Sequence, residues 1–308
     1  MTPILWIIQS IFVPAVSPLV IGVIKKIKAR FQNRQGASVL QPYRDLWKLF
    51  HKDEVVSRDA SWIFRVAPFI VFAITLVVGA SIPLVTLFLG NTYTSDIVVI
   101  IYTMAIGTFF LALAGMDVGG AFGGFGSSRE MTVSALAEGG FIFSLLTLAL
   151  VSGTTNIFSI AATIADLHIT LLLPLGFAFA GFFIVLLAET ARFPFDNPAT
   201  HLELTMIHEA MLLEYSGKRL ALMEWASANK LLIFIALASN LFFPWGIAQT
   251  LSLSALALGI SVFLGKILIF CFVIAVIESS IAKLRFFRLP DVLIVSFVLS
   301  AIAISLIQ

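Results

Sequence analysis

Long apolar stretches with very few charged residues divide the chain into eight candidate membrane-spanning segments. A hydrocarbon core needs about 20 apolar residues in helical form, within a range of about 17–25. Stretches of that kind occupy residues 4–24, 66–89, 97–116, 131–151, 169–188, 231–251, 256–277 and 292–308. Backbone amides in lipid must be satisfied within their own segment, so these stretches are expected to be helices. The pattern predicts an all-α polytopic membrane protein with about eight transmembrane helices, forming a single integral domain over residues 1–308.

A shorter segment between the first two spans has a different pattern. Apolar residues recur there at helical spacing and polar residues occupy the opposite face, the apolar set being Leu40, Tyr43, Leu46, Trp47 and Phe50 and the polar set Arg44, Asp45, Lys48 and Lys52. This pattern predicts an amphipathic helix lying at the membrane interface. Two roles remain open for it, a simple anchor on the membrane surface and a wall of a functional site.

Composition and charge placement support the membrane assignment and give its orientation. Hydrophobic residues make up 60% of the chain and charged residues 12%, against roughly 25% charged in ordinary soluble domains. Lys and Arg are concentrated, with ten in residues 25–65, one at Arg129, four in residues 192–230 and three in residues 283–288, which is 18 of 19. The positive-inside rule places these four connections in the cytoplasm and both termini outside.

Two of the connections expected in the cytoplasm, residues 25–65 and 189–230, are longer than plain connectors usually are. We expect them to form a docking surface. The single cysteine, Cys271, lies in an apolar span, so the chain offers no disulfide framework, iron–sulfur site or haem attachment motif. The glycine-rich residues 115–130 lack the ending of a phosphate-binding loop, which makes nucleotide binding improbable. They are expected to permit close backbone approach or to form a hinge.

Acidic residues are the main candidates for chemistry. Six lie within 36 residues of the second long segment, namely Glu189, Asp196, Glu203, Glu209, Glu214 and Glu224, and Glu130 and Glu138 lie at the start of and inside the fourth span. Ionisable groups at a membrane boundary cost free energy unless they are paired or hydrated, so the cluster suggests a polar cavity or a proton relay. A solvated loop that docks a partner is the alternative. On a continuous helix, Glu203 and Glu214 would share a face.

Two further points concern cations. Lys266 lies inside the seventh span, where it could pair with Glu138 or another buried carboxylate. The histidines of the second long segment do not have the HExxH spacing or an equivalent, so no metal site is predicted.

Four motifs carry a resemblance to a known family. RQG at 34–36 with LQPYRDLWKL at 40–49, and ETARFPFD at 189–196 with EYSG at 214–217, resemble the signatures of subunit 1 of respiratory complex I. That family includes the membrane anchor of energy-converting [NiFe] hydrogenases and subunit 4 of formate hydrogenlyase. The interval NPATHLELTMIHEAMLLEY at 197–215 and GSSRE at 126–130 are more similar to the hydrogenase branch.

The resemblance implies a membrane subunit that holds no cofactor itself and lies in the cell inner membrane. Its expected partners are a hydrogenase large subunit and an iron–sulfur small subunit on the cytoplasmic side, which carry the [NiFe] site and [4Fe-4S] clusters, together with antiporter-like membrane subunits and the lipid bilayer. Nucleic acid is not an expected partner. The alternatives are the quinone-binding membrane subunit of an NADH-quinone oxidoreductase, an ion antiporter subunit and a purely structural anchor.

Two sets of candidate site residues follow from the resemblance and the acidic pattern together. The proton-path candidates are Glu130, Glu138, Glu189, Asp196, Glu203, Glu209, Glu214 and Lys266. The candidates for a docking surface or a quinone-like cavity are Arg34, Gln41, Tyr43, Arg44, Asp45, Arg192, His208 and Tyr215.

Overall fold

A computed structural model describes residues 2–87, 93–165, 171–197, 206–250 and 252–307. Eight long helices dominate it: α1 (Thr2–Phe31), α3 (Trp62–Ser81), α4 (Ile97–Asp117), α5 (Ala121–Ser152), α7 (Leu172–Glu189), α9 (Gly217–Leu241), α10 (Leu253–Ser280) and α11 (Leu289–Ser305). The shorter helices are α2 (Gln41–Phe50), α6 (Ile157–Ala165) and α8 (His208–Leu212), with 3-10 turns η1 (Tyr93–Ser95) and η3 (Phe286–Arg288).

Eight helices of the described chain are long and apolar enough to cross a membrane. Each overlaps one of the eight predicted spans, so the prediction of an all-α polytopic membrane protein is confirmed. The predicted amphipathic helix also forms, as α2. It packs against α9 and α1 and leaves Trp47 69% exposed, so its apolar face is only partly covered by the rest of the chain.

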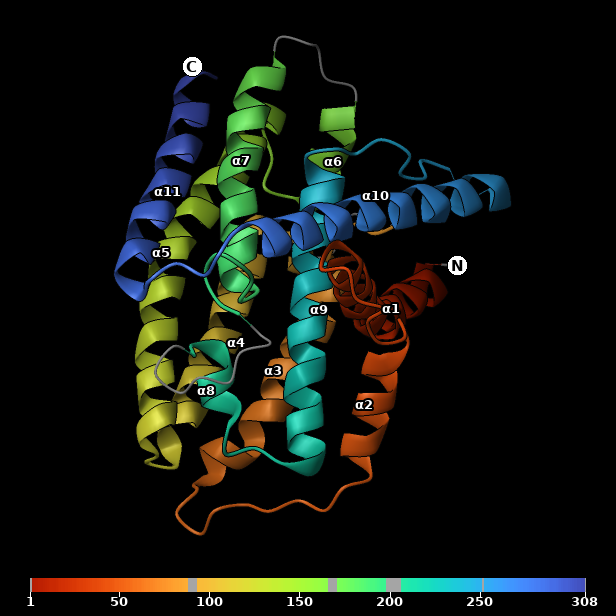
Figure 1. The fold of residues 1–308 in the computed structure, drawn as a ribbon. Helices are drawn as coiled ribbons and strands as arrows, with labels where there is room; N and C mark the ends of the chain where they lie inside the picture. The colour runs from red at the N-terminus through yellow and green to blue at the C-terminus, as the bar shows by residue number, and fades with distance from the viewer. Residues whose placement is uncertain (1, 88–92, 166–170, 198–205, 251, 308) are drawn as a thin grey trace.

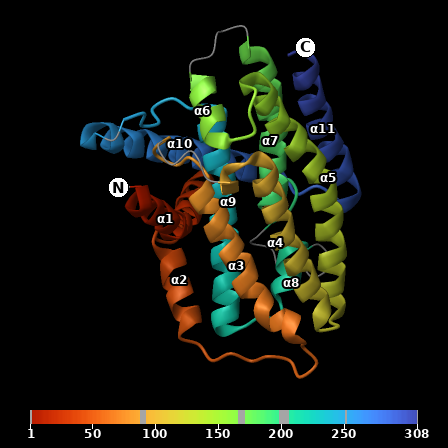
Figure 2. The ribbon, with the colours of Figure 1, turned by 180° about the vertical axis from the view of Figure 1, so that it is seen from behind.

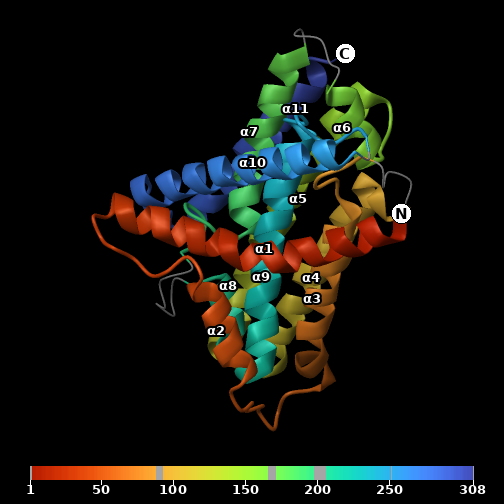
Figure 3. The same ribbon diagram turned by 90° about the vertical axis from the view of Figure 1, so that its right-hand side faces the viewer.

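The long helices form two packed groups and a crossing pair (Figures 1 and 2). Helices α5, α7 and α11 pack together, α3 packs against both α4 and α9, and α4 joins the groups by packing against α5. Helices α1 and α10 lie side by side and cross the others steeply (Figure 3). They contain 30 and 28 residues, which makes them about 42–45 Å long. A hydrocarbon core is about 30 Å thick, so helices of this length cross it at a tilt.

Close contact between α11 and its neighbours depends on two glycines. A Cβ on Gly140 of α5 would lie 2.1 Å from Ser296 Oγ, and one on Gly181 of α7 would lie 2.2 Å from Ser300 Oγ. Small residues allow this approach where helices in lipid gain mainly from van der Waals packing. The glycine-rich residues 115–130 also permit close backbone approach, as predicted, since a Cβ on Gly123 would lie 2.2 Å from the Gly115 carbonyl oxygen.

The predicted boundaries of the sixth span are wrong. Hydropathy predicts this span over residues 231–251, but α9 begins at Gly217 and ends at Leu241. The first turns of α9 carry charged residues, which favour a loop in the sequence, although a helix that extends beyond the hydrocarbon core can carry them. Residues 189–230 are consequently not one loop. They contain the short helix α8 and the first half of α9.

Candidate functional site

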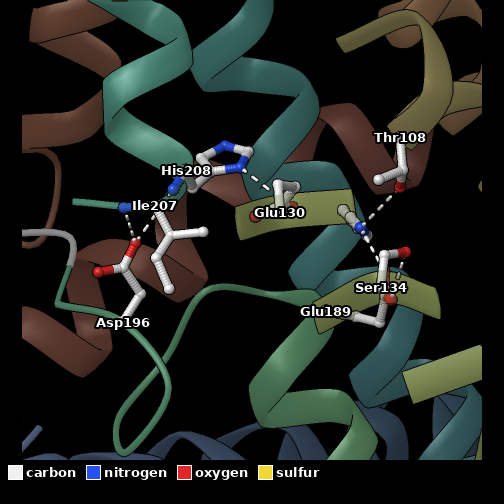
Figure 4. A network of polar contacts seen from close by, with 8 residues as sticks. Thr108, Glu130, Ser134, Glu189, Asp196, Ile207 and His208 are labelled. Atoms are coloured by element: carbon white, nitrogen blue, oxygen red, sulfur yellow. Dashed lines mark hydrogen bonds and ion pairs between the residues drawn. The ribbon is translucent and has the colours of Figure 1, made fainter. Parts of the chain in front are cut away.

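An ion pair connects α9 to the C-terminal end of α7. Lys230 Nζ lies 2.6 Å from Glu189 Oε2, and only 16% and 10% of the two side chains are exposed. Ser134 of α5 donates a hydrogen bond to the other oxygen of Glu189 at 3.1 Å, and Lys230 also approaches Thr108 Oγ1 of α4 at 3.5 Å. The carboxylate is therefore held by partners on two helices, as Figure 4 shows for the labelled residues.

A second ion pair lies nearby, between α8 and α5. His208 Nδ1 is 3.8 Å from Glu130 Oε1 (Figure 4). Burial of the imidazole lowers its pKa, but the adjacent Glu130 carboxylate outweighs this effect and the pKa of His208 is raised above its usual value of 6.5. The charge of Lys230 acts on both members of this pair. The two ion pairs therefore form one electrostatic unit.

Asp196 sets the position of His208. Its Oδ2 atom accepts hydrogen bonds from the backbone N–H groups of Ile207 at 3.2 Å and His208 at 3.1 Å (Figure 4). Its Oδ1 atom pairs with Lys283 Nζ at 2.6 Å. The start of α8 has unpaired backbone N–H groups, which a carboxylate satisfies well. The acidic end of the ETARFPFD motif is thus a structural support of the His208 site.

A third ion cluster lies at the C-terminal ends of α1 and α10. Glu278 accepts from Lys28 Nζ and Arg192 Nη1, each at 3.1 Å, and its own side chain is 3% exposed. The Lys28 ammonium also lies over the ring of Phe193, 4.8 Å from its centre. This cluster fixes the turn after α7 to both crossing helices.

A cavity of about 40 Å³ lies between α3, α4, α8 and α9. His208, Lys230, Thr75, Thr108 and Ser227 provide its polar lining, and the remaining residues are apolar or glycine. Thr75 also accepts a hydrogen bond from Asn229 Nδ2 at 3.0 Å, and Asn229 Oδ1 accepts from Ser17 of α1 at 2.6 Å. The cavity therefore adjoins both ion pairs and a buried chain of hydrogen bonds that leads to α1.

The other predicted proton-path residues do not all join this network. Glu138 lies one turn beyond Ser134 on α5 and is half-buried, and it forms no hydrogen bond or ion pair with described residues. Glu214 is exposed and follows the end of α8, so it does not lie on a helix that could continue toward Glu203. Glu209 is in α8 next to His208, on whose charge it acts. Glu203 lies outside the described residues.

Lys266 differs from expectation. Its Nζ donates to Asn240 Oδ1 at 3.1 Å and to the Phe243 carbonyl oxygen at 2.6 Å. Asn240 in turn donates to the carbonyl oxygens of Pro83 and Leu84. The pair with a buried carboxylate that the sequence left open for Lys266 does not form among the described residues. Lys266 instead binds neutral oxygens at the end of α9, where carbonyl groups lack helical partners and attract a cation.

The candidates for a docking surface or quinone-like cavity are spread over several places. Arg34 and Arg44 are exposed, and Gln41 donates to Asp45 on the same face of α2. The hydroxyl of Tyr43 donates to the Ala15 carbonyl of α1, and burial raises the pKa of Tyr43.

Tyr215 is buried apart from these residues. Its ring stacks on Phe64 with centroids 4.0 Å apart, and its hydroxyl donates to the Phe64 carbonyl at 2.9 Å. Burial raises the pKa of Tyr215 as well. Its contacts with α3 make it a packing residue between α8 and that helix.

The two long connecting segments contact each other. Ser216 Oγ accepts from the Val55 N–H and donates to the Val55 carbonyl, both at 2.9 Å. Arg219 Nη1 pairs with Glu54 Oε1 at 2.7 Å. Gly217 has a positive φ of 53°, and a Cβ there would lie 2.9 Å from the Asp53 carbonyl oxygen. The glycine therefore lets the first segment pack closely against the turn into α9.

Sequence reasoning misses the cations and hydroxyls that complete the site. Sequence reasoning treats Lys230 only as a charge in a loop, and Thr108 and Ser134 are not among its candidates. One signal is available for Lys230, since it directly precedes 35 residues without charge. No comparable signal distinguishes Thr108 or Ser134, because hydroxyl groups are common in apolar helices.

Comparison with known proteins gives the family. The model of the family described as NADH dehydrogenase matches residues 4–308. The chain belongs to the NADH dehydrogenase family. Among curated members, it is 32% identical to formate hydrogenlyase subunit 4 of Escherichia coli K12, covering 91% of this chain and 90% of the relative. Hydrogenase-4 component C of the same strain is 36% identical, with coverage of 96% and 92%.

The family members named as subunits of quinone oxidoreductases match over a smaller share of this chain and of their own length. A subunit of the NADH-quinone oxidoreductase of Paraburkholderia phymatum is 30% identical over 68% of this chain and 62% of the relative. The predicted likeness to the hydrogenase branch of the family is confirmed. A solved structure of the membrane-bound sulfane sulfur reductase, an archaeal respiratory membrane complex, contains a chain that matches with a TM-score of 0.82 and 20% identity, covering 100% of this chain and 99% of that one. This match supports the fold.

Proposed function

We propose that this chain is the cofactor-free membrane subunit of an energy-converting hydrogenase complex of the formate hydrogenlyase type. In this proposal it lies in the inner membrane with both termini outside. A peripheral arm, comprising a hydrogenase large subunit with the [NiFe] site and a small subunit with [4Fe-4S] clusters, docks on its cytoplasmic side. Antiporter-like subunits adjoin it in the membrane. The full-length likeness to formate hydrogenlyase subunit 4 and hydrogenase-4 component C supports this assignment.

The chain would couple electron transfer in the arm to translocation of protons or sodium ions. The observation that carries this role is the pair of adjacent ion pairs, Lys230–Glu189 and His208–Glu130, which are largely buried and mutually coupled. Charged groups are costly to keep in a low-dielectric region. A group whose protonation changes with a modest change in field can relay redox events, and a buried acid or histidine meets that condition.

Glu138 provides the test, since it is half-buried and the charge of Glu189 acts on it, which links it to the two ion pairs. It has no bond to a described residue that its replacement would break. A Glu138→Gln complex should assemble and evolve hydrogen at the normal rate, but translocate fewer ions per electron pair in membrane vesicles. Glu138→Asp keeps an acid at this position and should retain most of the coupling. Undiminished translocation by Glu138→Gln would refute the relay role.

A quinone-reducing complex is the second candidate, because membrane subunits of NADH-quinone oxidoreductases are relatives of this chain. The two candidates differ in a simple assay. The hydrogenase assignment predicts hydrogen evolution from a reduced viologen dye that resists quinone-site inhibitors. Inhibitor-sensitive quinone reduction without hydrogen evolution would favour the second candidate.

A further inference from the structure

The turn between α10 and α11 is fixed to the rest of the protein at several points. Lys283 Nζ pairs with Asp196 Oδ1 at 2.6 Å. The backbone N–H of Leu284 donates to the Pro194 carbonyl oxygen at 3.0 Å, and Leu289, where α11 begins, is fully buried. These contacts hold the backbone of the turn in place, so the side chains that it directs outward have a defined position.

Three residues of this turn project outward. Phe287 is 88% exposed, and Arg285 and Arg288 are exposed on either side of it. Neither guanidinium forms an ion pair or a hydrogen bond with the part of the chain that the structure describes. Phe286 instead packs against the core, with its ring 5.8 Å from the guanidinium carbon of Arg129. A fixed backbone thus displays an apolar ring between two cations that the chain does not neutralise.

The depth of the turn follows from the length of the span beside it. The apolar span that contains α11 runs from Phe286 to Ser305, which is 20 residues. At 1.5 Å per residue it is about 30 Å long, no longer than a hydrocarbon core is thick. Its ends therefore cannot lie far outside the core, which places the turn at the level of the lipid headgroups. Exposed apolar side chains continue along α11, including Ile294, Val295 and Val298.

A headgroup phosphate is the ligand that fits this turn best. A guanidinium can bind a phosphate through two parallel hydrogen bonds, and basic side chains at a bilayer surface attract anionic lipids. An apolar ring at that level enters the boundary between headgroups and acyl chains. One acid lies nearby, Asp291 in the first turn of α11, where the start of the helix favours a negative charge. The two arginines still leave an excess of positive charge.

We propose that Arg285 and Arg288 bind the phosphate of an anionic phospholipid, with Phe287 inserted beside its first acyl carbons. The site does not depend on the proposed function, since it requires no ion coupling. It does adjoin the region described above, because the segment that carries it is paired with Asp196. A bound lipid therefore restrains the backbone next to the acid that supports α8.

A photoreactive side chain at position 287 identifies what the turn contacts. Phe287→p-benzoylphenylalanine, illuminated in native membranes that contain the intact complex, should give an adduct heavier than the chain by one phospholipid. Because Phe287 is almost fully exposed, the change should not disturb folding. A cross-link to another protein subunit would overturn the proposal, since the turn would then be a surface for docking a protein.

The class of lipid in the adduct tests the two arginines. Adducts at position 287 should be several-fold richer in phosphatidylglycerol and cardiolipin than the membrane as a whole. Phe272→p-benzoylphenylalanine is the matched control, because Phe272 is 52% exposed inside the span of α10, and its adducts should match the membrane composition. Adding Arg285→Gln and Arg288→Gln to the first variant should abolish the enrichment but keep the lipid adduct. Enrichment that is absent at first, or that survives the loss of both arginines, would overturn the proposal.

Discussion

Lys230 Nζ lies 2.6 Å from Glu189 Oε2, joining the middle of α9 to the last residue of α7. The same carboxylate accepts from Ser134 of α5. One pair therefore connects three spans at the depth where the cavity lies. Removing either charge leaves the other largely buried and uncompensated.

The first prediction concerns this pair. Lys230→Met should lower the stability of the complex, by less than the roughly 3–5 kcal/mol found when fully buried pairs are broken, because Lys230 is 16% exposed. The double variant Lys230→Met/Glu189→Gln should recover part of that loss, since no charge remains buried alone. Thermal unfolding of the purified complexes measures both effects. Lys218→Met, at an exposed position of the same helix, is the control and should have no effect. Strictly additive losses would show that the two residues do not interact.

The second prediction is a pH dependence. Because the pKa of His208 is raised in the folded protein, its ion pair adds stability that is fully present below the unfolded value of about 6.5 and is lost as pH rises through the folded value. His208→Gln should therefore lower the unfolding temperature most at or below pH 6.5, with a difference that shrinks at higher pH. His51→Gln alters an exposed histidine of the chain and should show no such trend. A difference that grows with pH would contradict the assignment.

The third prediction tests the contact between α5 and α11. Gly140→Ala places a Cβ against Ser296 Oγ and should cost about 1–3 kcal/mol from overpacking. Ser296→Ala removes that oxygen, which is buried without a hydrogen-bond partner among the described residues. The new Cβ also lies 3.0 Å from Val185 Cγ2, so the double variant should regain most, not all, of the lost stability. Gly181→Ala places a Cβ against both Ser300 Oγ and the Ser296 carbonyl oxygen, at 2.2 and 2.8 Å. The matching change Ser300→Ala should not rescue it, because the carbonyl oxygen remains. Unfolding temperatures provide the measurement.

The fourth prediction separates a structural role from a relay role for Lys266. Its ammonium binds Asn240 and the Phe243 carbonyl at the end of α9, so Lys266→Met should lower the unfolding temperature of the complex. The number of ions translocated per electron pair should not change. A normal unfolding temperature combined with lost coupling would return Lys266 to the proton path.

The fold can largely be predicted, because a membrane span is recognised by the length and hydropathy of a segment, and both are read directly from the sequence. Boundaries are less predictable. The charges of Lys218, Arg219 and Glu224 suggest a loop, but helical hydrogen bonding continues through them, and only packing against α2 and α3 reveals it.

The acidic residues of the site can be predicted from the sequence, but the cations that pair with them cannot. Glu130, Glu189 and Asp196 stand out by their position at membrane boundaries, and each pairs with a half-buried basic side chain in the structure. Which cation meets which acid depends on how spans far apart in sequence pack together, as with Arg192 and Glu278. Lys266 is a different case. A cation inside a span suggests a buried acid as its partner, whereas here an amide oxygen and a backbone carbonyl oxygen bind it.

The slant of α1 and α10 has a consequence for the surrounding lipid. Two long helices lying obliquely can adapt to a thinner or thicker bilayer by changing their inclination. Lys28 and Glu278 lie near the C-terminal ends of these helices, and Glu278 also binds Arg192. A change in lipid acyl-chain length is therefore expected to shift the position of the turn that precedes Asp196. The thickness of the host membrane would then affect how this subunit works.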